Sequence, residues 1–151
     1  MKNYQDNNGQ AFHLTVTGMP ITKGSVKPYT GGHGRALPDD PRLTVWQATI
    51  MQAATIEKQR RRLKTYQVPV TVATIFTMPR PIRPRFPYPA TQARKEKGGG
   101  DLDKLCRAVG DALEKAGIIQ NDALIVDWQA SKRYANDTSK PGVTLIIAPK
   151  Q

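Results

Sequence analysis

An apolar stripe at helical spacing, closed by a glycine, constrains the fold of this chain more than any other sequence feature. Apolar side chains recur every three or four positions at Leu102, Leu105, Cys106, Val109, Ala112, Leu113 and Ala116. This spacing predicts an amphipathic helix over 101–116, and Gly117 supplies its C-terminal stop. Such a helix has to bury its apolar face against another element of the same domain.

Segments that alternate apolar and polar residues supply that partner, because a period of two is typical of half-buried strands. We expect strands at 11–17, 68–78, 124–134 and 143–148. In the third strand, the residues expected to face the core are Leu124, Val126, Trp128 and Ala130.

A second helix is predicted from Asp40 to about Lys64. Asp40 can cap the first free N–H groups, and Pro41 fits the first turn. The order strand, helix, strand, helix, strand, strand predicts an α/β (α+β) fold, in which two main helices cover a mixed sheet of about four strands. With 151 residues, we expect a flexible arm over 1–10 and a single domain over 11–151.

Several classes of protein are excluded by composition. No apolar run approaches the roughly 20 residues that a membrane helix requires, and the N-terminus shows no secretion signal, so we expect a cytoplasmic protein. One cysteine excludes an intrachain disulfide framework. Two histidines lie twenty residues apart, at His13 and His33, and leave oxygen atoms as the ligands for any divalent ion.

Charge is distributed very unevenly along the chain. The formal net charge is +11, and the stretch from Lys58 to Lys97 holds eleven basic residues and one acid, Glu96. Six of the twelve acidic residues then fall between Asp101 and Asp127. A basic surface favours a polyanionic partner such as nucleic acid.

The acidic cluster predicts a metal site. Asp101 and Asp103 lie at the expected helix start, where aspartates are also common as caps, but capping does not explain Asp122 on the turn after the helix. Carboxylate oxygens are the ligands that Mg²⁺ prefers. Near a phosphodiester, such an ion activates water and neutralises the leaving oxygen. We therefore expect these three aspartates to converge.

Between the second strand and the acidic helix, residues 79–100 are rich in proline and in basic residues. A segment this long inside a small domain is usually functional or disordered. Its arginines are interleaved with Phe86 and Tyr88, a combination suited to binding phosphates and stacking on unpaired bases.

The segment GDLDKLCRAVGDALEKAGIIQNDALIVDWQASKRYANDTSKPGVTLIIAP resembles the C-terminal half of the RusA family of Holliday junction resolvases, and VTGMPITKGSVKP is similar to the family's first strand and basic loop. The resemblance implies a RusA-like fold in which Asp101, Asp103 and Asp122 bind Mg²⁺, with Mn²⁺ as a substitute. It also implies that Arg107 contacts the scissile phosphate, where the family has a lysine.

The resemblance is not complete around these residues. Lys104 stands where the family has asparagine, and Asn121 replaces the first member of an acidic pair, whereas Asp111 and Lys132 match family positions. Together with the basic loops, this gives the predicted DNA-binding set: Lys23, Lys27, Arg80, Arg83, Arg85, Arg94, Lys95, Lys97, Lys104 and Lys132.

The function implied by the resemblance is a Mg²⁺-dependent, structure-selective endodeoxyribonuclease of the kind common in phage and prophage genomes. It would resolve four-way junctions by paired symmetric nicks, act as a homodimer whose two-fold axis matches those cuts, and need no small-molecule cofactor. Two alternatives stay open: a non-enzymatic nucleic-acid-binding protein, which the charge fits equally well, and a nuclease for flaps or other branched DNA. Cys106 is expected to be a small buried residue rather than a nucleophile.

Overall fold

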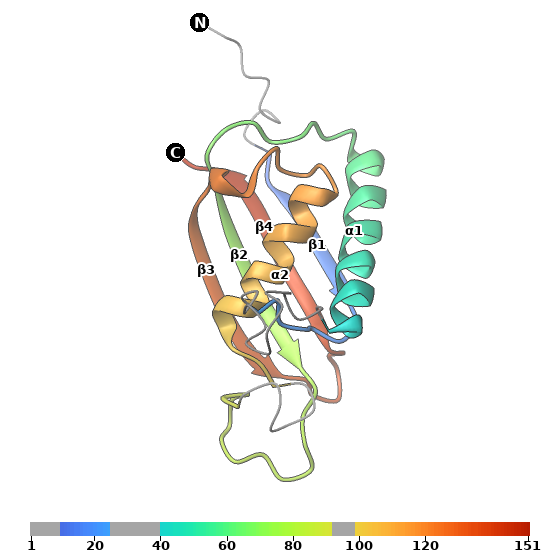
Figure 1. The fold of residues 1–151 in the computed structure, drawn as a ribbon, viewed down its shortest axis with the longest axis vertical. Helices are drawn as coiled ribbons and strands as arrows, with labels where there is room; N and C mark the ends of the chain where they lie inside the picture. The colour runs from blue at the N-terminus through green and yellow to red at the C-terminus, as the bar shows by residue number, and fades with distance from the viewer. Residues whose placement is uncertain (1–9, 25–39, 92–98) are drawn as a thin grey trace, which may run out of the picture.

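A four-stranded mixed sheet forms the centre of the molecule (Figure 1). The computed structural model describes residues 10–24, 40–91 and 99–151. Its elements are β1 (Phe12–Thr17), α1 (Pro41–Arg61), β2 (Val70–Met78), α2 (Leu102–Lys115), the short 3-10 helix η1 (Asp122–Leu124), β3 (Ile125–Tyr134) and β4 (Gly142–Pro149). The strand order is β1-β4-β2-β3. β4 runs antiparallel to β1 and β2, whereas β3 runs parallel to β2, so the predicted mixed sheet is confirmed.

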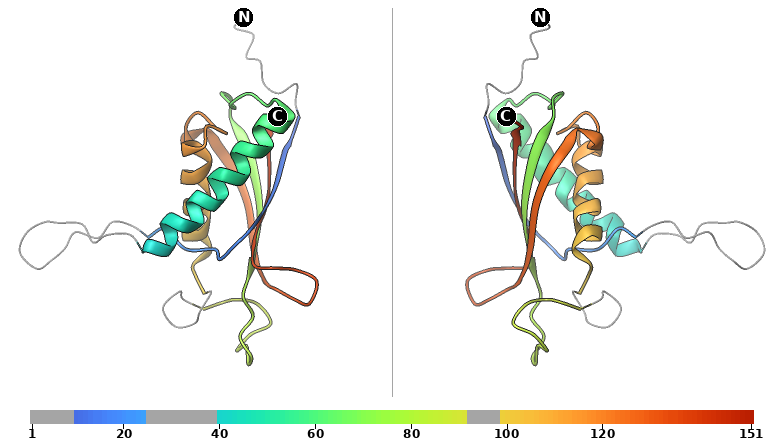
Figure 2. Two further views of the ribbon diagram at one scale, coloured as in Figure 1. Left: turned by 90° about the vertical axis from the view of Figure 1, so that its right-hand side faces the viewer. Right: turned by 90° about the vertical axis from the view of Figure 1, so that its left-hand side faces the viewer.

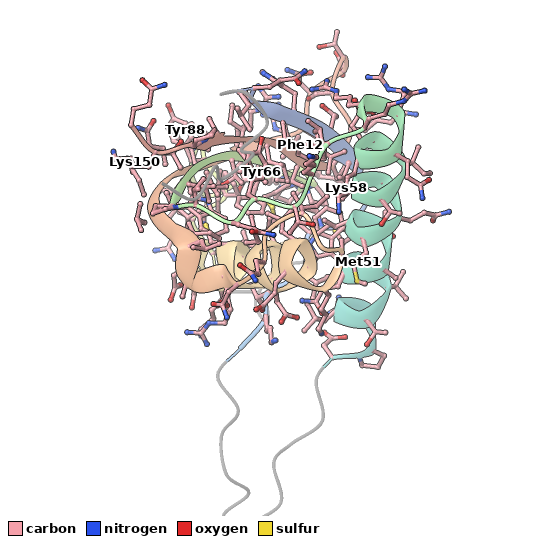
Figure 3. All side chains as sticks on the ribbon, turned by 90° about the horizontal axis from the view of Figure 1, so that it is seen from above. Phe12, Met51, Lys58, Tyr66, Tyr88 and Lys150 are labelled. Atoms are coloured by element: carbon pink, nitrogen blue, oxygen red, sulfur yellow. The ribbon has the colours of Figure 1, made fainter. Side chains whose placement is uncertain are left out.

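Both helices pack on the same face of the sheet, as the side views show (Figure 2). The core lies between the two layers, where Phe12 and Tyr66 are each 1% exposed and Trp46 of α1 is 2% exposed. Seen from above, Phe12 and Tyr66 lie in this interior (Figure 3). Within the described part of the chain, no helix covers the opposite face of the sheet.

The predicted helices form for the expected reasons. The carboxylate of Asp40 accepts a hydrogen bond from the Arg42 amide at 2.9 Å, and Pro41 occupies the first turn of α1. α1 ends at Arg61, slightly before the expected Lys64, because Arg62 adopts a left-handed conformation with φ of 53°. α2 buries its predicted apolar stripe and stops before Gly117, whose φ is +71°.

The prediction for β3 was wrong at its beginning. Val126 does not face the core but is 56% exposed, and Leu124 belongs to η1. The cause is a β-bulge: Val70 pairs with Ile125 and Thr71 with Asp127, so that Val126 has no partner on β2. An extra residue reverses the alternation at that point.

Two further expectations concern the N-terminal arm and the absence of membrane-spanning helices. The flexible arm expected at residues 1–10 lies outside the described residues, apart from Gln10, whose carbonyl accepts a hydrogen bond from the Tyr66 hydroxyl at 2.8 Å. Among the described residues, no helix has the length and apolar character needed to cross a membrane.

Gly142 is expected to be the more sensitive of two glycines with positive φ. At Gly142, where φ is +157°, a Cβ atom would collide with the backbone carbonyl of Val16 on β1. At Gly117 a Cβ atom would meet only the flexible end of Lys58, at 3.8 Å. We expect Gly142→Ala to lower the free energy of unfolding by about 3 kcal/mol, and Gly117→Ala by about 1 kcal/mol. Urea titration measures both, and equal losses would contradict this packing.

Candidate active site

The two aspartates at the start of α2 are not ordinary helix caps. Asp101 occupies the N-cap position, but its side chain makes no capping hydrogen bond. Asp40 and Asn121, by contrast, both cap the helices that follow them. The Asp101 carboxylate is 45% exposed and pairs with the Lys104 ammonium at 3.1 Å, and Asp103 is exposed two residues further along the chain. Because capping does not occupy it, the Asp101 carboxylate remains accessible to a ligand.

The backbone just before these aspartates is held by two hydrogen bonds at Gly100. The Lys132 ammonium on β3 donates a hydrogen bond to the Gly100 carbonyl at 2.8 Å, and the Gly100 amide donates to the Thr91 carbonyl at 2.9 Å. A side chain at Gly100 would lie only 2.6 Å from the Thr22 methyl group. Burial lowers the pKa of Lys132, although the charge of Asp101 acts in the opposite direction. The hydrogen bonds at Gly100 therefore position the start of α2, and with it Asp101 and Asp103.

A groove of about 380 Å³ runs between α2 and β3. Arg107 and Asp122, two of the predicted catalytic residues, line it together with Cys106, Val126 and Trp128. Arg107 is one helical turn beyond Asp103, so the two side chains project from neighbouring positions on α2. The groove therefore brings together the guanidinium predicted to bind phosphate and one of the predicted metal ligands.

The three predicted metal ligands do not converge within one chain. All three are described, yet among the described residues no group of three His, Cys, Asp or Glu side chains is placed to hold a metal ion. Whether the three aspartates bind a metal ion stays a prediction, but within one chain they are not placed around a common ion. The reason is that Asp101 and Asp103 begin α2, whereas Asp122 lies in η1 near the opposite end of that helix (Figure 1). A helix of 14 residues is about 21 Å long.

Three of the predicted DNA-binding cations already have partners in the protein. Lys104 pairs with Asp101, Lys132 with the Gly100 carbonyl, and Lys23 with the Asp111 carboxylate at 3.1 Å. Their contribution to DNA binding stays a prediction, but each also has a structural role.

The other predicted DNA-binding cations lie in the segment between β2 and α2 or in the loop after β1. Arg80, Arg83 and Arg85 are exposed, and the Arg85 guanidinium lies 5.3 Å from the centre of the Phe86 ring. Lys27, Arg94, Lys95 and Lys97 fall outside the described residues.

The basic end of α1 is used by the fold itself. Lys58 donates hydrogen bonds to the Thr65 hydroxyl at 2.9 Å and to the Gly117 carbonyl at 3.0 Å. Arg60 and Arg61 both pair with Glu57. The Lys58 contact with Gly117 ties the end of α1 to the end of α2, whereas the two arginine pairs lie within α1.

Sequence reasoning missed Gln47, which connects the two helices. Gln47 is 8% exposed, and its amide nitrogen donates to the Ala108 carbonyl at 3.0 Å and to Asp111 at 2.8 Å. The available signal was a polar residue on an otherwise apolar stripe of α1. Burial tends to raise the pKa of Asp111, but hydrogen bonds from Lys115, Lys23 and Gln47 outweigh it and hold the pKa below its usual range.

Cys106 is half-buried rather than buried as expected, but it is unsuited to act as a nucleophile. Burial raises the pKa of its thiol to about 11, with the nearby Asp103 charge adding to the effect and a hydrogen bond with Thr74 opposing it. The thiol is therefore protonated at neutral pH, whereas the thiolate is the reactive form.

Comparison with known proteins agrees with this arrangement. The profile of the endodeoxyribonuclease RusA family matches residues 20–148. The chain belongs to the RusA family of endodeoxyribonucleases. The RusA match includes both helices, the groove and the aspartates at the start of α2. A similar curated protein is the crossover junction endodeoxyribonuclease RusA of Aquifex aeolicus (strain VF5), which is 26% identical over 142 residues, with 94% of each chain covered. The predicted RusA resemblance is thereby confirmed.

The Asp111 network predicts a specific dependence of stability on pH. Because the pKa of Asp111 is lowered in the folded state, its contribution is fully present above the ordinary aspartate pKa of about 4 and is lost as the pH falls through the lowered value. We expect Asp111→Asn to lower the free energy of unfolding by about 2 kcal/mol at pH 7, and by less below about pH 3.

Denaturant unfolding over this pH range measures the effect. Asp137→Asn, in the exposed turn between β3 and β4, is the control and should change stability by less than about 0.5 kcal/mol. A loss at Asp111 that did not vary with pH would show that the charge of this carboxylate is unimportant.

Proposed function

We propose that this chain is a Mg²⁺-dependent, structure-selective endonuclease that acts inside the cell and resolves four-way DNA junctions by paired symmetric nicks. The main support is the Asp101 carboxylate, which holds a cap position without capping, at a helix start that the Gly100 hydrogen bonds position beside a basic loop. Family membership and the name of the Aquifex relative, a crossover junction endodeoxyribonuclease, agree with this substrate.

Each part of the site has a distinct role in the proposal. Arg107 binds the scissile phosphate and stabilises the charge that develops on it, as an exposed guanidinium in the groove can do. Lys132 keeps Asp101 and Asp103 in place through the Gly100 carbonyl. A Mg²⁺ or Mn²⁺ ion bound by the aspartates would supply an activated water and neutralise the leaving oxygen.

The separation of the ligands within one chain supports a homodimer. If two copies pack with their α2 helices antiparallel, Asp122 of the partner subunit meets Asp101 and Asp103 of the first. The two-fold axis then generates two equivalent sites, which suits two symmetric nicks. Val126, exposed in the groove by the bulge, offers an apolar contact for such packing.

The first test of this function is cleavage by an aspartate variant. We expect Asp103→Asn to reduce cutting of a labelled four-way junction by about a thousandfold or more, because a metal ligand is lost. Junction binding in chelator should be equal or tighter, since a negative charge is removed beside a polyanion. Asp40→Asn, at the N-cap of α1, is the matched control and should cut at the parental rate, because asparagine also caps helices.

The assay includes a flap, a linear duplex, Mg²⁺, Mn²⁺ and chelator. Cutting by Asp103→Asn at the parental rate would contradict the assignment. Preferential cutting of the flap would favour the branched-DNA alternative, and binding without any metal-dependent cutting would favour a non-enzymatic protein.

A second prediction follows if each metal site takes its aspartates from both subunits of the dimer. When Asp103→Asn and Asp122→Asn chains are co-expressed, one site of each mixed dimer carries both substitutions and the other carries neither. We therefore expect the mixture to recover single nicks that neither variant makes alone, detected on the labelled junction strands. No recovery, in a mixture shown to contain mixed dimers, would mean that the three aspartates are not shared in this way.

A further inference from the structure

The loop that follows β2 exposes an unusual amount of apolar surface. Ile82 is 99% exposed, Tyr88 65% and Phe86 45%. These are three of the eight exposed large apolar side chains among the described residues, and they lie within seven positions of one another. Single exposed apolar residues are common, but a group on one projecting segment indicates a binding surface.

Prolines hold this loop open. Residues 79–91 contain neither helix nor strand and carry five prolines, Pro79, Pro81, Pro84, Pro87 and Pro89. Each proline fixes its own φ and favours an extended conformation in the residue before it, so the loop does not collapse over its apolar side chains. It projects beyond the end of the sheet, in yellow-green (Figures 1 and 2). Because little order has to be gained on binding, little entropy is lost.

The side chains of the loop indicate what kind of partner it binds. Arg80, Arg83 and Arg85 alternate with the apolar residues, and residues 79–91 contain no acid. The Arg85 guanidinium stacks over the Phe86 ring. Cations that alternate with flat and apolar side chains match a ligand that offers phosphates together with exposed base faces. Unstacked bases, rather than paired duplex, present such faces.

The loop is also close to the proposed cutting site. Its far end is bound there, because the Thr91 carbonyl accepts the Gly100 amide directly before Asp101. Its near end begins three residues after Phe76, the β2 neighbour of Lys132. At about 3.3 Å per strand residue, that start lies about 10 Å from the residue that binds the Gly100 carbonyl.

We propose that residues 79–91 form a wedge, in which Ile82 and Tyr88 contact bases unstacked at the branch point while the arginines bind the flanking phosphates. The inference rests on the proposed function and adds to it the element that distinguishes branched from linear DNA. Apolar side chains that enter or cap a base step stabilise its unstacked form. A linear duplex has no such step open, so the wedge gains nothing from it.

The test compares two double variants of the full chain in chelator, where binding is measured without cutting. Ile82→Ser/Tyr88→Ser removes the wedge, and Val45→Ser/Ile56→Ser removes two equally apolar side chains on α1 that are 67% and 57% exposed. The probes are a four-way junction with 2-aminopurine at the branch point and a linear duplex of equal length. We expect the wedge variant to bind the junction about tenfold more weakly and the duplex less than about twofold more weakly, and to lose the 2-aminopurine fluorescence increase. The α1 variant should match the parent.

The outcomes distinguish failure of the wedge from failure of the junction nuclease. If the wedge variant binds junction and duplex with equal losses, or keeps the full fluorescence increase, the wedge is overturned while the junction nuclease stands. If the parent itself shows no preference for the junction, the proposed function fails and the wedge fails with it. We expect Arg83→Gln to weaken binding to the junction and to the duplex by the same factor. It should also lower the slope of log affinity against log salt concentration by about one.

Discussion

The parallel pairing of β2 and β3 determines where the candidate aspartates and the basic loop between β2 and α2 lie. Two consecutive parallel strands need a crossover connection, and here it consists of the basic loop followed by α2. The loop, the start of α2 and the end of β3 therefore meet at one end of the sheet (Figure 1). η1 precedes β3 and so lies at the other end. A single topological constraint thus brings the cations to Asp101 and Asp103 and keeps Asp122 away from them.

Much of the fold could be predicted from local patterns. Alternation located β1 and β2, and the Asp-Pro start and glycine stop located the helices, because these signals depend on neighbouring residues alone. The bulge at Val126 could not be predicted, since it depends on the register between β2 and β3. The same limit applies to the positions of the three aspartates. Spacing along the chain indicates which residues share a helix face, but not at which end of the sheet a strand starts.

In the candidate site, too, some residues could be identified from the sequence, whereas the contacts that hold them could not. The aspartates and Arg107 were found from composition, spacing and resemblance, and whether they bind metal and phosphate stays a prediction. The hydrogen bond from Lys132 to the Gly100 carbonyl spans 32 residues, and the bond from Gln47 to Asp111 spans 64. Contacts between segments this far apart leave no local pattern. Lys132 was assigned to DNA binding because it is basic and matches a position of the family, whereas its hydrogen bond to a backbone carbonyl could not be predicted from the sequence.

The bulge on β3 has a consequence for how the protein avoids misassembly. β3 is an edge strand of ten residues, and such a strand offers unpaired N–H and C=O groups to any other strand it meets. The irregularity at Val126 interrupts that row of groups near its start, and Lys132 and Arg133 place cations near its end. A strand of a neighbouring molecule therefore cannot form a continuous ladder of backbone hydrogen bonds along β3. The edge of β3 is therefore poorly suited to extending a continuous sheet into a second copy of the chain.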